Sequence, residues 1–66
     1  MGRVFALVST GLLARIYIDK LCEISDLGEW GGGLYWIKVD DPRYEDGSYD
    51  VVLDDDGLRF QRDRDV

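Results

Sequence analysis

The 66 residues predict a single domain over residues 1–66, with a core of modest size. One cysteine and no histidine exclude an intramolecular disulfide and a structural zinc site. The 14 acidic and 8 basic residues give a net charge of −6. This charge disfavours direct binding to nucleic acid, because Lys and Arg supply the affinity for phosphates. The unpaired Cys22 is typical of a reducing compartment, so we expect a cytoplasmic protein.

The first third of the chain predicts a strand and a helix. Residues 3–8 are apolar and rich in β-formers, which favours a buried strand. Residues 4–18 are too short and too polar for a membrane span, which needs roughly 20 apolar residues. Residues 12–19 alternate as a strand would, but a helical period fits the longer range of residues 12–27. We therefore expect a helix over about 11–27, with Gly28 as its left-handed cap.

The remaining residues predict three strands, at 34–39, 48–53 and 58–62. Gly31 to Gly33 read as a turn or linker, and residues 40–47 as a loop. The turn from Asp54 to Gly57 should close a hairpin that pairs Leu53 with Leu58 and Val51 with Phe60. Residues 62–66 are expected to be a frayed tail.

The predicted order is β-α-β-β-β, a small two-layer α+β domain. The last three strands would form an antiparallel meander, the helix would cover one face, and the first strand would complete the sheet. If residues 12–19 formed a strand instead, the alternative fold would be a five-stranded small β-barrel.

The sequence favours a protein without enzymatic activity and without a cofactor. The commonest general base is absent, and the serines lack the context of a nucleophile. Cys22 lies among Asp19, Glu23 and Asp26 on the expected helix, and these carboxylates should raise its pKa and leave the thiol inert. The segment Asp54 to Gly57 does not match a calcium loop, since Asp55 and Gln61 stand where Gly and Glu are needed. We expect no metal, with a weak calcium site at this turn as the alternative.

The net charge comes from residues 40–56, which contain eight acidic residues and one basic residue, Arg43. A concentrated acidic surface favours association with a positive surface. Tyr and Trp often carry interface energy, although each aromatic here could also belong to the core. The predicted partner-binding residues are the eight acids and two bordering aromatics: Trp36, Asp40, Asp41, Tyr44, Glu45, Asp46, Asp50, Asp54, Asp55 and Asp56. A second acidic surface is expected on the helix, at Asp19, Glu23 and Asp26. Tyr49 is assigned either to the interface or to the buried face of its strand.

The segments DDPRYED and DVVLDDD, on a small domain without catalytic residues, resemble the small acidic anti-defence proteins of bacteriophages. These include anti-CRISPR proteins and DNA-mimicking inhibitors of restriction enzymes. The resemblance implies a monomeric inhibitor in the host cytoplasm. It would bind a basic, DNA-reading surface of a host nuclease complex, such as a subunit of a type I CRISPR effector. Its carboxylates would stand in for phosphates.

The alternative is a general interaction module or a structural phage protein that uses Tyr35 and Trp36 instead of charge. The acids themselves form either one stripe or two patches, because the loop and the hairpin turn leave opposite ends of the strand at 48–53. Of these two arrangements, only the stripe would imitate a nucleic-acid backbone.

Overall fold

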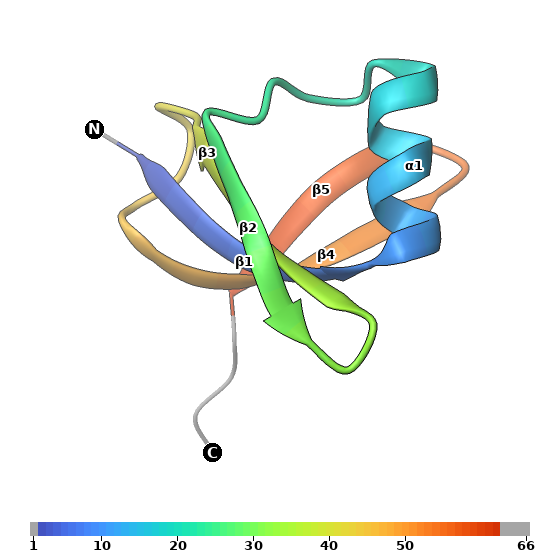
Figure 1. The fold of residues 1–66 in the computed structure, drawn as a ribbon. Coiled ribbons are helices and arrows are strands. Elements are labelled where there is room, and N and C mark those ends of the chain that lie inside the picture. Colours follow the sequence, from blue (N-terminus) through green and yellow to red (C-terminus); the bar gives the residue numbers. More distant parts are fainter. Residues whose placement is uncertain (1, 63–66) are drawn as a thin grey trace.

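The computed structural model describes residues 2–62, which form one helix and five strands (Figure 1). The elements are β1 (Arg3–Ser9), α1 (Thr10–Asp19), β2 (Asp26–Gly31), β3 (Leu34–Asp40), β4 (Gly47–Asp54) and β5 (Gly57–Arg62). The strands form a single open mixed sheet in the order β2-β3-β1-β4-β5. The predicted α+β domain is confirmed, and the closed-barrel alternative is wrong.

β1 occupies the centre of the sheet. It pairs antiparallel with β3 along its whole length and parallel with the first residues of β4. The predicted meander is therefore wrong, because β1 lies between β3 and β4. The loop at residues 41–46 is long enough to carry the chain past the start of β1, whereas a tight turn would have kept β3 and β4 adjacent. At this crossing the Asp41 N–H donates to the Gly2 carbonyl (2.7 Å). A Cβ at Gly2 would overlap the carbonyls of Asp41 and Tyr44.

The helix begins where predicted and ends earlier. The Ser9 hydroxyl caps it by accepting from the Leu12 N–H (3.2 Å). It ends at Asp19, and Lys20 takes the left-handed conformation that closes it (φ 52°). A helix over 11–27 would be about 25 Å long, as long as the whole molecule, whose extents are 26 × 25 × 24 Å. The shorter helix leaves residues 20–25 to return across the core. Within residues 2–62 no helix is long and apolar enough to cross a membrane.

Part of the segment predicted as helix becomes β2 instead. Gly28 lies inside this edge strand and does not cap the helix. Gly32 and Gly33, at positive φ (61° and 80°), form the turn that brings β2 back onto β3. The expected turn at the three glycines is thus present, but it closes a hairpin that the sequence pattern did not reveal.

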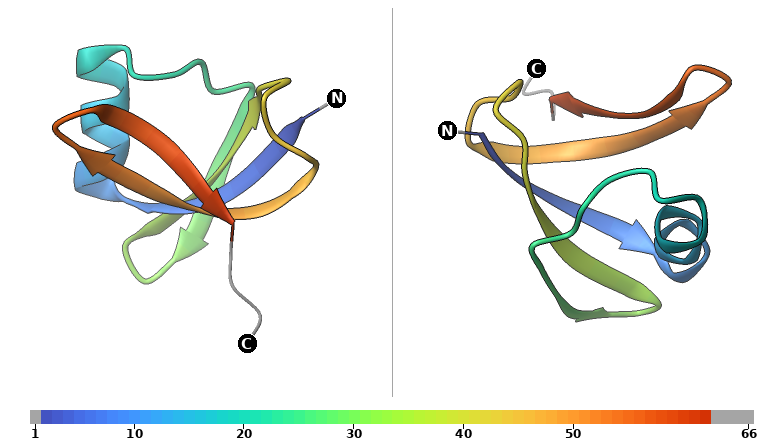
Figure 2. Two further views of the ribbon diagram at one scale, coloured as in Figure 1. Left: turned by 180° about the vertical axis from the view of Figure 1, so that it is seen from behind. Right: turned by 90° about the horizontal axis from the view of Figure 1, so that it is seen from above.

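The core lies between α1 and one face of the sheet. Its buried side chains come from β1, β3, β4, β5 and the helix, and they are Val4, Ala6, Val8, Ile16, Ile37, Val39, Tyr49 and Phe60. The helix and the segment after it lie on the concave side of the twisted sheet, between the two outer hairpins (Figure 2). Within residues 2–62, the opposite face of the sheet carries no helix.

The hairpin of β4 and β5 has the predicted register. Leu53 pairs with Leu58 and Val51 with Phe60. The turn itself is formed by Asp55 and Asp56, followed by Gly57 at φ 110°. Arg62, expected in the frayed tail, is the last residue of β5. The rest of that predicted tail, residues 63–66, lies outside the described residues.

The Gly28–Trp36 pair explains why β2 contains a glycine. The two residues are cross-strand partners, and a Cβ at Gly28 would lie 2.5 Å from three atoms of the indole ring. The Trp36 ring therefore covers the glycine, as aromatic residues do when they compensate for glycine in a sheet.

We expect Gly28→Ala to lower the free energy of unfolding by about 1–3 kcal/mol, because the indole must move out of a packed position. Denaturant unfolding measures the change. Gly11→Ala is the matched control, since nothing lies within 4 Å of a Cβ there and alanine favours the helix. Adding Trp36→Ala to Gly28→Ala should remove most of the clash. Equal stability of Gly28→Ala and the wild type would contradict the packing described.

Candidate interaction surface

The sheet face without a helix collects four of the predicted site residues. Neighbouring residues of a strand point to opposite faces, so the register places Trp36 and Asp40 of β3 on this face. Asp50 and Asp54 of β4 share it. We call this side of the sheet the uncovered face.

An aromatic pair lies at the middle of the uncovered face. The rings of Phe5 and Trp36 stack at 6.2 Å between centroids and an interplanar angle of 21°. The ammonium of Lys38 lies 5.7 Å from the Trp36 ring, within the range of a cation–π interaction. Leu7 and Leu34 beside the pair are 38% and 36% exposed. This apolar centre with polar neighbours has the composition of a protein interface.

Four carboxylates form what we call the acidic strip, which is Asp50, Asp54, Asp55 and Asp56. All four side chains are exposed. Asp54 forms an ion pair with Arg59 (3.5 Å) and also accepts from the Asp56 N–H (3.0 Å). Asp50, Asp55 and Asp56 form no ion pair among residues 2–62. On strand geometry Asp50 and Asp54 are about 13 Å apart, so the strip runs from the sheet to the hairpin tip.

The acids of the loop at residues 41–46 are engaged within the molecule. Asp41 binds Arg43 through both carboxylate oxygens (2.7 and 3.0 Å), and the hydrogen bonds from Arg43 lower the pKa of Asp41. Glu45 pairs with Arg62 (3.3 Å). Asp46 accepts from the Arg3 N–H (2.8 Å). These contacts hold the loop against the start of β1 and the end of β5.

The eight predicted acids therefore form separate groups. The loop lies at the beginning of β4 and the strip ends at the tip beyond it, about 23 Å away along an eight-residue strand. Asp40 is at the loop end, on the uncovered face. Of the two arrangements left open by the sequence, the structure has two patches.

Two aromatics considered for the interface pack in or against the core, namely Tyr44, which was predicted to bind a partner, and Tyr49, for which both assignments were open. Tyr49 is buried, and its hydroxyl donates to the Glu45 carbonyl (2.6 Å). Tyr44 is half-buried, packs edge-on against Tyr49 and Phe60, and its hydroxyl accepts from the Phe60 N–H (3.3 Å). Tyr35 and Trp36 lie on opposite faces of β3, so they do not form one contact surface.

The second acidic surface does not form as predicted, because the helix ends before it. Asp19 is in α1 and pairs with Arg15 (2.9 Å), Glu23 is in the following segment, and Asp26 begins β2. These three residues do not share a helix face.

The uncovered face also contains residues that the sequence did not single out, namely Arg3, Phe5 and Lys38. Alternation within β1 and β3 indicates which face each of them takes. The sequence does not indicate that β1 and β3 are neighbours, and that pairing brings the three side chains together.

The described residues contain no group of three or more His, Cys, Asp or Glu side chains that could hold a metal ion. The carboxylate of Asp54 is already bonded to the Asp56 N–H and lies beside Arg59. The structure thus gives no support to the calcium alternative at this turn.

Comparisons with protein-family models, with curated proteins and with solved structures gave no match for the chain.

Cys22 lies in the segment after the helix, half-buried against the core. Burial raises the pKa of its thiol, and the charge of Asp41 raises it further. The predicted direction is confirmed. The cause is different, because burial dominates and the nearby acid is Asp41 instead of the acids of a longer helix.

A raised pKa leaves less thiolate at a given pH, so Cys22 should react slowly with a thiol reagent at pH 8. Its alkylation rate should rise with pH, and the midpoint of this rise should lie at a higher pH than that of a free cysteine peptide. Mass spectrometry of the folded protein measures these rates, and the unfolded protein serves as the control. A folded-state rate equal to that of the peptide at pH 8 would contradict the burial of this thiol.

Proposed function

We propose that the protein is a non-enzymatic inhibitor that binds a basic, DNA-reading surface of another protein through the acidic strip. The observation that carries this proposal is the state of the four carboxylates. All are exposed, and three of them have no ion pair among residues 2–62. Among the loop acids, by contrast, Asp41 and Glu45 form ion pairs and Asp46 accepts a backbone hydrogen bond.

The one ion pair within the strip is a weak obstacle. The Arg59 and Asp54 side chains are about half exposed, and an exposed pair contributes about 0–1 kcal/mol. A partner cation can therefore replace Arg59. Asp50 lies on the sheet and Asp56 on a two-residue turn, so the backbone that carries them is already ordered and mainly side-chain entropy is lost when they bind.

The two patches do not reproduce a continuous nucleic-acid backbone, so the DNA mimicry that we propose is confined to the four carboxylates of the strip. Duplex DNA carries one charge per about 1.7 Å of axis, much denser than the strip. Four carboxylates imitate a few phosphates, enough to occupy one local DNA-reading site. The partner class we propose is a host nuclease complex, such as a type I CRISPR effector, with the protein supplied by a phage in the host cytoplasm.

Charge reversal of the tip, Asp54→Lys with Asp55→Lys and Asp56→Lys, should weaken partner binding on the order of 100-fold, because like charges would meet at the contact. The assay is capture from a bacterial lysate on the immobilised protein, followed by release with duplex DNA. The triple Asn variant keeps a side-chain oxygen at position 54 for the Asp56 N–H. It should bind with intermediate affinity and confirm that the fold is intact.

The charge-matched control reverses Asp19, Glu23 and Glu29, which are exposed and lie outside the strip. Loss of binding in this control as large as in the tip variant would show that net charge alone acts. If duplex DNA does not release the captured partner, the partner surface is not one that reads DNA.

A second candidate function is supported by the Phe5–Trp36 pair, which offers an apolar contact on the same face. If this pair dominates binding, Trp36→Ala should cost at least about 2 kcal/mol of affinity, as an aromatic hot spot does. The loss should be the same at low and high salt, whereas charge-driven binding weakens as salt rises. Trp30→Ala is the control, since Trp30 is an exposed tryptophan of β2. Equal losses in both variants would argue against a specific role for the pair.

A further inference from the structure

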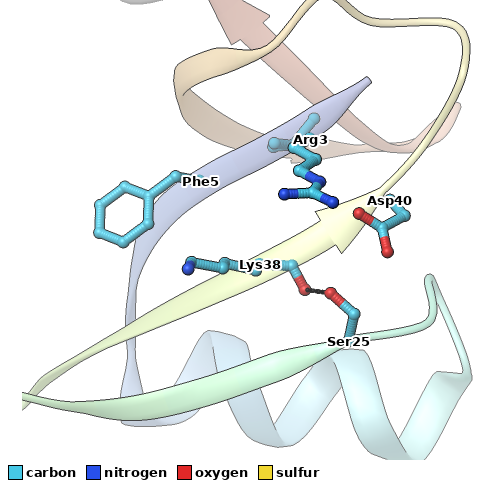
Figure 3. Close-up of a pocket in the computed structure, with 6 residues that line it drawn as sticks. Arg3, Phe5, Ser25, Lys38 and Asp40 are labelled. Atoms are coloured by element: carbon cyan, nitrogen blue, oxygen red, sulfur yellow. Dashed lines mark hydrogen bonds between the residues drawn. The ribbon is translucent and has the colours of Figure 1, made fainter. Parts of the chain in front are cut away.

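A groove lies on the uncovered face at the end opposite the hairpin tip. Its volume is about 200 Å³, and it is lined by Arg3, Val4 and Phe5 of β1, Lys38 and Asp40 of β3, and Ser25. Because one water molecule occupies about 30 Å³ in the liquid, the groove has room for several waters or one polar side chain. Figure 3 shows the guanidinium of Arg3 reaching from β1 toward β3, while Lys38 extends toward Phe5.

The two cations of this groove are available to a ligand. Arg15, Arg43, Arg59 and Arg62 each form an ion pair, whereas Arg3 and Lys38 form none with any of residues 2–62. Arg3 is opposite Asp40 and Phe5 is opposite Lys38 in the β1–β3 ladder. The two basic residues are therefore diagonal neighbours, about 7–8 Å apart, within reach of long side chains. Their charged groups extend in different directions (Figure 3), with the Lys38 ammonium beside the Trp36 ring, and both residues line the same groove.

The wall of the groove is fixed. Both the backbone N–H and the hydroxyl of Ser25 donate to the Lys38 carbonyl (2.7 and 2.9 Å). The Arg3 N–H is held by Asp46 (2.8 Å). The Phe5 ring is held by its stacking on Trp36. These contacts fix the backbone at Arg3 and Lys38 and the position of the Phe5 ring, so the walls of the groove lose little freedom when a ligand binds.

Asp40 limits which ligands fit the charge of the groove. Its carboxylate leaves the groove with a net charge of about +1, which suits a single carboxylate better than a phosphate dianion. It also provides an acceptor for an N–H donor of the ligand. A peptide bearing an acidic side chain offers both groups.

We propose that this groove binds an acidic side chain of a partner polypeptide. The carboxylate lies on Arg3 and Lys38, a backbone N–H of the peptide donates to Asp40, and an apolar neighbour packs on Phe5. The proposal uses none of the acidic strip, so it stands or falls separately from the proposed inhibitor function.

The test is a titration of the full chain, followed by amide NMR shifts, with the blocked dipeptide acetyl-Phe-Glu-amide. The shifts should saturate in the millimolar range and centre on Arg3, Phe5, Ser25 and Lys38. The isosteric acetyl-Phe-Gln-amide should bind about tenfold more weakly, since hydrogen bonds to a charged group contribute about 1.5–3 kcal/mol. Equal binding of the two dipeptides, or shifts centred elsewhere, overturns the proposal.

Arg3→Gln and Lys38→Gln, singly and together, should each weaken binding of the acidic dipeptide, and Lys20→Gln is the charge-matched control. The single Arg3→Gln variant leaves the Lys38–Trp36 contact in place, so it tests the site even if the double variant is unstable. Unchanged affinity in Arg3→Gln overturns the proposal. A parallel titration with benzoate tests whether the groove binds a free small carboxylate. If benzoate binds as tightly as the dipeptide, the groove takes small carboxylates and the assignment to a polypeptide is wrong.

Discussion

The central position of β1 is the constraint on which the rest of the structure depends. Its backbone bonds to β3 on one side and to β4 on the other. Its alternation sends Val4, Ala6 and Val8 into the core and leaves Phe5 on the opposite face. Because the helix follows at once after Ser9, the chain must turn back over the core face. The loop after β3 must then pass the start of β1, where Gly2 allows its close approach. Helix position, strand order and the uncovered face all follow from this strand.

Those parts of the fold that depend on neighbours in sequence could be predicted. The β4–β5 hairpin is specified by its turn residues and its alternation, and its register was predicted correctly. The helix start is specified by the Ser9 cap. The helix end could not be predicted, since Leu21 and Ile24 continue the helical period yet pack on the core from an irregular segment. β2 has weak strand propensity and exists because β3 supplies its partner bonds and Trp36 covers Gly28. Contacts between residues far apart in the sequence determine both the end of the helix and the formation of β2.

The same distinction explains the outcome for the acidic residues. Their concentration is visible in the sequence, but their availability depends on which cations the fold brings near. Glu45 and Arg62 are 17 residues apart, and their contact follows from the β4–β5 pairing. Asp41 has its cation two residues away in Arg43, yet a short loop had to close before both carboxylate oxygens were engaged. Net charge therefore overstates how many carboxylates a partner meets. The strip is the part that the fold leaves open.

The uncovered face has a character that its architecture does not require. Antiparallel sheets commonly expose one face to water, and then that face is polar. Parallel strands are usually covered on both faces, and here β1 runs parallel to β4 at the middle of the sheet. Next to this parallel pair lie Phe5 and Trp36, flanked by Leu7 and Leu34. Arg3, Lys38 and Asp40 border this apolar centre at one end of the face, and the acidic strip borders it at the other. In the function that we propose, a second protein would contact this face, and the two charged ends would fix its orientation.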